Sequence, residues 1–153
     1  MKSTQKKNIK NHLVSVIMNC HNGEKYLQQS LNSLLIQSYN NWELIFYDNC
    51  STDNSALILK RYRDKRIKYF KSNKKLNLGL ARKKALEKAR GKLISFLDTD
   101  DLWKKNKLYM QTKVFNNNKI GFSITNSTFF NKSKSRYLYS SRINFKKKVF
   151  YKL

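Results

Sequence analysis

Three carboxylates stand within four residues in the second half of the chain: Asp98, Asp100 and Asp101 directly follow an apolar run at residues 93–97. Carboxylates this close repel one another and raise one another's pKa, so the cluster is costly unless a cation lies among them. Mg²⁺ and Mn²⁺ prefer oxygen ligands, often one or two carboxylates together with the phosphates of a substrate. The spacing therefore predicts a divalent metal site, with Asp100 and Asp98 as ligands, that bridges the protein to a diphosphate.

Polar residues also follow two earlier apolar runs. Asn19, Cys20 and His21 come after the run at 13–18, and Asp48 ends the run at 43–47. Near-continuous apolar runs of this length are typical of strands in a parallel sheet that is covered on both faces. Ligands of such sheets bind beyond the carboxyl ends of the strands. We therefore expect the three polar groups to face one crevice.

Helical patterns separate the apolar runs. Leucines recur at helical spacing between residues 27 and 35, and the segment 51–53 has the composition of a helix cap. The spacing predicts helices from the cap at 51–53 to about residue 63, over 78–89 and over 104–116, and further strands at 67–70, 120–130 and 137–145. Gly91 is expected to end the third helix. The alternation of strand and helix predicts an α/β fold with a mostly parallel sheet.

Composition gives weaker information. The chain has 153 residues, 40% of them hydrophobic, which is enough for one folded domain. Its net charge of +24 attracts polyanions at low salt, although we attribute most of this charge to compositional drift. Two cysteines make no disulfide framework, and residues 1–11 lack the apolar segment of a signal peptide, so a cytoplasmic setting is expected. No stretch has the length and apolarity of a membrane span.

Four stretches in this order and spacing resemble glycosyltransferase family 2, the nucleotide-sugar-dependent enzymes with a GT-A fold. They are residues 14–27, 42–53, 77–82 and 94–103, within a resemblance that covers about residues 13–119. The resemblance implies a Rossmann-like, three-layer α/β/α sandwich that is truncated at its C-terminal end. We expect a basic lead at 1–12, the nucleotide-sugar-binding domain at 13–130, and a basic, aromatic tail at 131–153 that forms an incomplete acceptor region.

The resemblance also implies residue roles. The loop formed by Asn19, Cys20 and His21 would hold the nucleotide base, with the His21 ring stacked on it. Asp48 would accept a hydrogen bond from the base edge, most often of uracil, and Arg82 would lie near the nucleotide. By the same resemblance Asp98 would face the ribose or the sugar, and Asp100 would ligate Mn²⁺ or Mg²⁺.

The sequence departs from the usual family pattern near Asn19, where Pro is common and this chain has none, and at two neighbouring positions further on. Asn49 stands where a second Asp is common, and Cys50 stands where Gly is common. Asn49 removes negative charge but keeps hydrogen-bonding capacity, and Cys50 is expected to shift the loop. These departures bear on nucleotide preference more than on the fold.

At several positions a purely structural role is the alternative to the functional one. His21 would then be an ordinary loop residue, and Asp48 would be a turn residue at the end of a strand. Two lysines follow Arg82, so a solvated basic face explains it equally well. Asp53 is expected to be only a helix cap, and Trp103 to be a packing anchor behind the carboxylates.

Sugar transfer leaves negative charge on the departing diphosphate, which a metal held by Asp100 would neutralise. An inverting enzyme also needs a general base for the acceptor hydroxyl, which family members place well downstream. No Asp, Glu or His follows Asp101 in this chain, so its catalytic base is unknown. Three explanations stay open: a truncated transferase that binds the donor but turns over poorly, which we favour; an active enzyme whose base is Asp101 or comes from a partner; and a binding module.

The expected function is transfer of a sugar, from UDP-sugar most often, to a glycan or lipid-linked acceptor in envelope polysaccharide synthesis. Peripheral contact with the anionic inner face of the membrane is a further expectation. The alternative rests on basic and aromatic residues interleaved at 132–137 and 146–151, which suit single-stranded nucleic acid or an anionic membrane. Because no nucleic-acid-binding motif is visible, no specific nucleic acid partner is expected.

Overall fold

The computed structural model describes residues 11–130 and 135–137. Its contacts divide the chain into two compact units, residues 1–120 and 121–153, which are described separately. Among the described residues, no helix is both long and apolar enough to cross a lipid bilayer.

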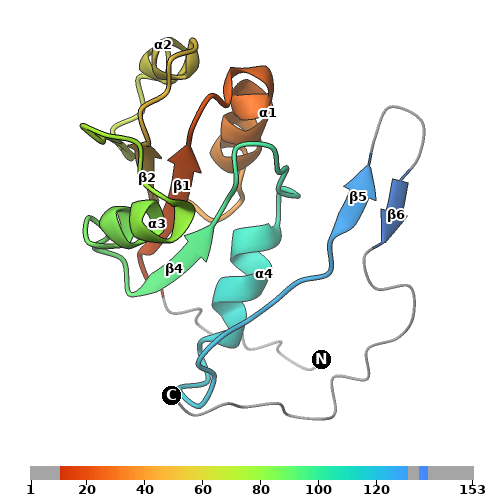
Figure 1. Cartoon of the computed structure of the whole chain (residues 1–153). Helices are drawn as coiled ribbons and strands as arrows, with labels where there is room; N and C mark the ends of the chain where they lie inside the picture. The colour runs from red at the N-terminus through yellow and green to blue at the C-terminus, as the bar shows by residue number, and fades with distance from the viewer. Residues whose placement is uncertain (1–10, 131–134, 138–153) are drawn as a thin grey trace, which may run out of the picture. The chain divides into compact units, whose positions relative to one another are not determined.

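The first unit is built on a four-stranded parallel sheet, as predicted. Its strands are β1 (Val14–Cys20), β2 (Trp42–Asp48), β3 (Ile67–Lys71) and β4 (Leu93–Phe96), in the order β3-β2-β1-β4. The two central strands are almost entirely buried, which accounts for their unbroken apolar sequences. The register places Cys20 beside Asp48 and Ile17 beside Phe96, so the strands end near one another at the same edge. The arrowheads of β1 and β4 in Figure 1 point to this edge.

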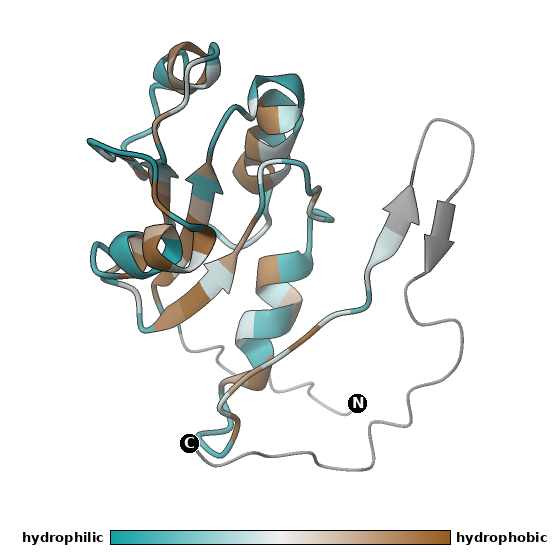
Figure 2. Ribbon diagram, viewed as in Figure 1, coloured by the Kyte–Doolittle hydropathy of each residue, from teal (hydrophilic) through white to brown (hydrophobic). Residues whose placement is uncertain are grey.

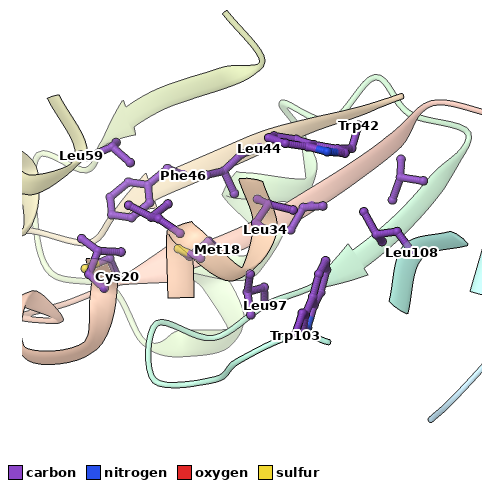
Figure 3. Packing of buried hydrophobic residues seen from close by; sticks show 14 of the residues in the cluster. Met18, Cys20, Leu34, Trp42, Leu44, Phe46, Leu59, Leu97, Trp103 and Leu108 are labelled. Atoms are coloured by element: carbon purple, nitrogen blue, oxygen red, sulfur yellow. The ribbon is translucent and has the colours of Figure 1, made fainter. Parts of the chain in front are cut away.

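Helices cover both faces of the sheet and give the expected three layers. They are α1 (Glu24–Leu35), α2 (Ser55–Lys60), α3 (Leu78–Leu86) and α4 (Lys107–Val114). Leu34 of α1, Leu59 of α2 and Leu108 of α4 pack in one apolar cluster, which Figure 3 shows around Phe46 and Met18 of the sheet. On the other face, Ala81 and Ala85 of α3 pack against Ile17, Ile45 and Tyr47. The hydropathy colours of Figure 2 show hydrophobic strands between helices that mix both kinds of residue.

Several predicted helix ends were wrong, each for a local reason. After α2 and α3, hydrogen bonds from residue i+3 to residue i tighten the chain, so these helices end at residues 60 and 86. The fourth helix begins at Lys107, whose N–H donates to the Lys104 carbonyl in a tight turn, and the Lys104 and Lys105 carbonyls also accept from Gln37 and Ser38, just after α1. The N-cap residue of α2 is Asn54, and the Asp53 carboxylate accepts from the N–H groups of Glu24 and Ser55.

The second unit contains an antiparallel hairpin of β5 (Thr128–Phe130) and β6 (Ser135–Tyr137). The strand predicted over 120–130 was therefore wrong for most of its length, since residues 121–127 form no regular structure. Most of the strand predicted at 137–145 and most of the basic, aromatic tail lie outside the described residues.

A buried carboxylate with a partly exposed cationic partner lies at the amino-terminal edge of the sheet. Glu43 is only 3% exposed and accepts hydrogen bonds from Ser15 Oγ (2.7 Å), Arg90 N (2.8 Å) and Arg90 Nη2 (2.8 Å). Burial opposes ionisation, but these donors outweigh it and lower the pKa of Glu43 below its ordinary value of 4.5. Gly91 N–H also donates to Ser15 Oγ, and a Cβ on Gly91 would lie 2.5 Å from the Ser15 nitrogen, so only glycine fits.

We expect Glu43→Gln to lower the free energy of unfolding by about 2 kcal/mol at neutral pH, because the charge-assisted bonds to Arg90 are lost. The cost stays moderate since Arg90 is 69% exposed and can rehydrate. Folding lowers the Glu43 pKa, so its contribution is complete above pH 4.5 and disappears as the pH falls through the folded-state pKa. Urea unfolding should show a difference in unfolding free energy between the unmodified chain and Glu43→Gln that narrows below pH 4.5. A difference that stays constant with pH would contradict the lowered pKa of Glu43.

Candidate functional site

The loops after β1, β2 and β4 meet at the carboxyl edge of the sheet. Asn49 N–H donates to the Cys20 carbonyl (2.7 Å), and Leu97 N–H donates to the Ile17 carbonyl (3.0 Å). A Cβ placed on Gly23 would lie 3.2 Å from the Thr99 Cβ, so the first loop touches the carboxylate turn directly. The structure thus brings together the three polar groups that the sequence singled out.

The carboxylates lie on a tight turn. Asp101 N–H donates to the Asp98 carbonyl (3.1 Å), and this bond closes the four residues into a β-turn. Burial, and then the charges of Asp100 and Asp98, raise the pKa of Asp101, while Lys107 opposes the shift. With three carboxyl groups, the turn is a local concentration of acidic side chains on a chain whose net charge is +24.

Arg82 reaches this turn from the second turn of α3. Its Nη2 lies 3.0 Å and 3.3 Å from the two carboxylate oxygens of Asp98, and its guanidinium lies 5.7 Å from the centre of the Phe96 ring. Both side chains of the pair keep exposure, 37% and 51%. Arg82 is thus placed at the candidate site and is not merely part of a solvated basic face.

The donor chemistry of the turn fits a divalent cation that is shared with a substrate. Asp100 is exposed, and within the described residues its carboxylate receives no hydrogen bond or ion pair. No group of three or more His, Cys, Asp or Glu side chains among the described residues forms a complete cage for a metal. Mg²⁺ and Mn²⁺ commonly take one or two carboxylates and fill the remaining positions with substrate phosphates and water, so an open pair such as Asp100 and Asp98 suits them.

The loop after β1 presents His21. Its Nδ1 lies 3.0 Å from the Asn49 carbonyl, which can only accept, so this nitrogen carries the proton and Nε2 is left as an acceptor in the neutral ring. The ring is exposed and is held by this contact. Asn19, near the carboxyl end of β1, has a buried amide nitrogen with no partner among the described residues. His21 therefore offers an exposed hydrogen-bonding group at the carboxyl edge, whereas the amide nitrogen of Asn19 is buried beneath it.

Cys20 and Asp48 differ from their expected placement, because the side chains of both are buried. Cys20 is 1% exposed and belongs to the apolar core, and its burial raises the thiol pKa. Asp48 has 0% exposure, and its oxygens accept from the Ser51 N–H (2.8 Å) and from the Tyr69 hydroxyl (2.8 Å). Neither side chain can touch a ligand unless its neighbours move.

Asn49 is engaged with the backbone ahead of α3. Its Nδ2 donates to the Leu76 carbonyl (2.8 Å) and its Oδ1 accepts from the Leu76 N–H (2.9 Å), a two-way clamp that an Asp could not form. Cys50 adopts φ = 59°, the left-handed region that favours glycine, and its Sγ lies 3.1 Å from the Ser72 carbonyl. The loop therefore keeps a backbone conformation that glycine adopts readily, although the residue is cysteine.

Sequence reasoning missed Tyr69. The Tyr69 ring stacks on Phe46 with 6.1 Å between centroids, and burial followed by the Asp48 carboxylate raises the Tyr69 pKa to about 12. The available sequence signal was the hydroxyl-bearing Tyr69 near the end of the third predicted strand, which pairs with the strand that ends at Asp48. Lys107 was also missed: its Nζ lies 4.3 Å from the centre of the Trp103 ring, and burial lowers its pKa to about 8.

Comparisons with known proteins agree with this geometry. A family model described as Glycosyl transferase family 2 matches residues 15–153. TuaG of Bacillus subtilis, a glycosyltransferase named for teichuronic acid biosynthesis, is 41% identical over 115 residues, which are 74% of this chain and 46% of TuaG. WfgD of Escherichia coli, a UDP-Glc:alpha-D-GlcNAc-diphosphoundecaprenol beta-1,3-glucosyltransferase, is 39% identical over 120 residues, 78% of this chain and 47% of WfgD.

Solved structures lead to the same family. TarS of S. aureus (residues 1–349), solved in complex with UDP-GlcNAc, has 35% sequence identity and a TM-score of 0.61, over 63% of this chain and 29% of that one. A mannosyltransferase of Pyrobaculum calidifontis, in complex with GDP-Man and Mn²⁺, has 21% identity and a TM-score of 0.61, over 68% of this chain and 31% of that one, and so supports the fold alone. The chain spans about half the length of the curated relatives TuaG and WfgD. From its family match, its relatives and its parallel α/β fold, the chain belongs to glycosyltransferase family 2.

Proposed function

We propose that the chain binds a UDP-sugar together with Mn²⁺ or Mg²⁺, and that it serves transfer of the sugar to a glycan or lipid-linked acceptor in envelope polysaccharide synthesis. The observation that carries the proposal is the meeting of the carboxylate turn 98–101 with the loops after β1 and β2 at one edge of a parallel sheet. The printed names of relatives support the donor and acceptor classes: WfgD uses UDP-Glc and a diphosphoundecaprenol-linked sugar, and TarS was solved with UDP-GlcNAc.

The proposed roles follow from exposure. Asp100 ligates the metal, and Asp98, held by Arg82, assists it and faces the ribose or the sugar. Arg82 lies near the nucleotide and the exposed His21 contacts the base, while Asn19, whose amide nitrogen is buried, supports the base-binding loop from β1. When bound, the metal would supply positive charge to the departing diphosphate.

In this proposal, Asp48 and Cys20 support the loops around the base and do not contact it. The Asp48 carboxylate fixes the Ser51 N–H, and its backbone carbonyl accepts from the Ser72 N–H (2.8 Å), so it connects the loop after β2 to the chain after β3. Cys20 lies beneath Gly23 and shapes the first loop by packing, since a Cβ on Gly23 would lie only 3.0 Å from Cys20 Sγ. These residues set the shape of the base pocket without direct contact.

Acceptor activation is not assigned to a residue. An inverting transfer, as the family resemblance implies, needs a base for the acceptor hydroxyl. Asp101 is the last acidic residue, and no histidine follows it.

Isothermal titration of the chain with UDP-GlcNAc or UDP-Glc tests the donor-binding proposal. Binding should be present with Mn²⁺ or Mg²⁺, and the affinity should fall by about 100-fold when EDTA removes the metal, because the diphosphate loses its bridge to Asp100. Titration without detectable heat for either sugar, with either metal, would contradict the proposal.

The net charge of +24 favours peripheral membrane binding as a second property, which would place a lipid-linked acceptor near the site. The expected location is the inner face of the cytoplasmic membrane, where anionic headgroups attract basic residues. The chain should float with anionic vesicles and not with neutral ones, and the fraction bound should fall as salt is raised. Binding to RNA but not to anionic vesicles would favour the nucleic acid alternative instead.

A further inference from the structure

Three buried polar side chains on α1 and just beyond its end hold the segment that carries the carboxylate turn. Ser30 is 0% exposed, Ser33 is 7% exposed and Gln37 is 3% exposed, although they lie on the same side of the helical segment as the core leucines. Polar groups at core-facing positions cost free energy unless they are hydrogen-bonded. Here each one is bonded, and each has at least one partner in the backbone of residues 98–108.

The contacts form a continuous series. Ser30 Oγ donates to the Asp98 carbonyl (3.0 Å), and Ser33 Oγ accepts from the Trp103 N–H (3.1 Å) while donating to the Ser30 carbonyl (2.7 Å). Gln37 Nε2 donates to the Lys104 carbonyl (2.9 Å), and Gln37 Oε1 accepts from the Leu108 N–H (3.0 Å). The loop from 98 to 108 is thereby fixed to α1 at both ends.

The bond from Ser30 acts at the turn itself. The Asp98 carbonyl also accepts the Asp101 N–H that closes the β-turn, so Ser30 occupies the other acceptor position of that oxygen. Leu97 and Trp103, on either side of the turn in the sequence, are anchored in the same apolar cluster as Leu34 of α1 (Figure 3). Between these two anchors, Ser30 is the described side chain that bonds to the backbone of the turn.

We propose that Ser30, supported by Ser33 and Gln37, is a positioning residue that fixes the Asp98–Asp101 turn in the orientation needed for metal-dependent binding of the nucleotide diphosphate. The proposal rests on the proposed function and deepens it, because it assigns the geometry of the metal site to the first helix. Partners that orient metal ligands typically matter by 10–100-fold in metal affinity. A merely structural role would instead change stability and leave the effect of the metal unaltered.

The test compares UDP affinity with Mn²⁺ and with EDTA, by isothermal titration of the full chain. The ratio of the two dissociation constants measures what the metal contributes. In Ser30→Ala this ratio should fall about tenfold, while the affinity in EDTA should stay unchanged. Ser15→Ala is the matched control: Ser15 is equally buried and hydrogen-bonded, but lies at the opposite edge of the sheet, so its loss should lower stability and leave the ratio unchanged.

An unaltered ratio in Ser30→Ala would overturn the proposal while leaving the proposed function intact. Absence of UDP binding by the unmodified chain with Mn²⁺ would instead refute the proposed function, and this inference with it. If Ser30→Ala does not fold, Ser33→Ala tests the same segment through the Trp103 N–H, and an unaltered ratio there would count equally against the proposal.

Discussion

Asp100→Asn should remove the metal dependence of UDP-sugar binding, lowering the affinity in Mn²⁺ by about 100-fold, to the level measured in EDTA. Loss of a residue that only orients a metal ligand already lowers metal affinity 10–100-fold. Asp100 is proposed as a direct ligand, so its loss should have an effect at the upper end of this range. Asparagine keeps the size of the side chain and removes its charge. Since Asp100 is exposed and has no hydrogen-bond partner within the described residues, the fold should be unaffected. Titration calorimetry in each condition measures the affinities, and thermal unfolding measures the stability.

Glu87→Gln provides the charge-matched control. It removes one negative charge from the far end of α3, where Glu87 forms an exposed pair with Lys84. The control should bind the donor like the unmodified chain, because the Debye length of about 8 Å at physiological salt screens so distant a charge. Metal-dependent binding that survives in Asp100→Asn would move the metal site away from this turn.

Asp48→Ala should be the most destabilising substitution considered for this chain, at about 3–5 kcal/mol. It leaves the Ser51 N–H and the Tyr69 hydroxyl without their buried acceptor, at about 1–3 kcal/mol each. It also opens a cavity where the carboxylate was fully buried. Urea unfolding at neutral pH measures the loss directly.

Tyr69→Phe helps to decide whether Asp48 has a structural role or contacts the base. It removes a single hydrogen bond and should cost about 1–2 kcal/mol of unfolding free energy. A smaller loss than for Asp48→Ala supports a structural role, in which the carboxylate holds both Tyr69 and Ser51. If Asp48→Ala were as stable as the unmodified chain but bound UDP weakly, the carboxylate would be a direct ligand of the base. That result would contradict the burial-based assignment.

The sheet was predictable because buried parallel strands have a simple sequence pattern. The runs at 13–18 and 43–47 became β1 and β2 with shifts of at most two residues, since nearly every side chain in these strands is buried. The edge strand β4 alternates between half-buried and exposed residues, yet its short apolar run before the carboxylates still identified it. The resemblance to family members then supplied the three-layer arrangement.

Helix ends were harder to predict, because they depend on hydrogen bonds to distant parts of the chain. The carbonyls of Lys104 and Lys105 bond to Gln37 and Ser38, which are more than sixty residues earlier, and hold the segment before α4 in a turn. No local signal records such a partner. The strand expected at 120–130 failed similarly, since an apolar pattern alone does not provide a neighbouring strand for pairing.

The candidate site was predictable in position but not in detail. Parallel strands end at one edge, so the loops carrying His21, Asp48 and Asp98 had to meet there. Which of these side chains is exposed follows from packing, and Asp48 is buried because Tyr69 on β3 and the Ser51 N–H already satisfy its carboxylate. Ser30 carried a sequence signal, a polar residue among core leucines, but its partner at Asp98 is visible only in the fold.

Diffraction at the manganese absorption edge, from crystals of the chain grown with Mn²⁺ and UDP, tests the central claim most directly. The account predicts an anomalous peak within coordination distance of a carboxylate oxygen of Asp100 and of the diphosphate of UDP. A peak elsewhere, or bound UDP with no metal at the 98–101 turn, would contradict it.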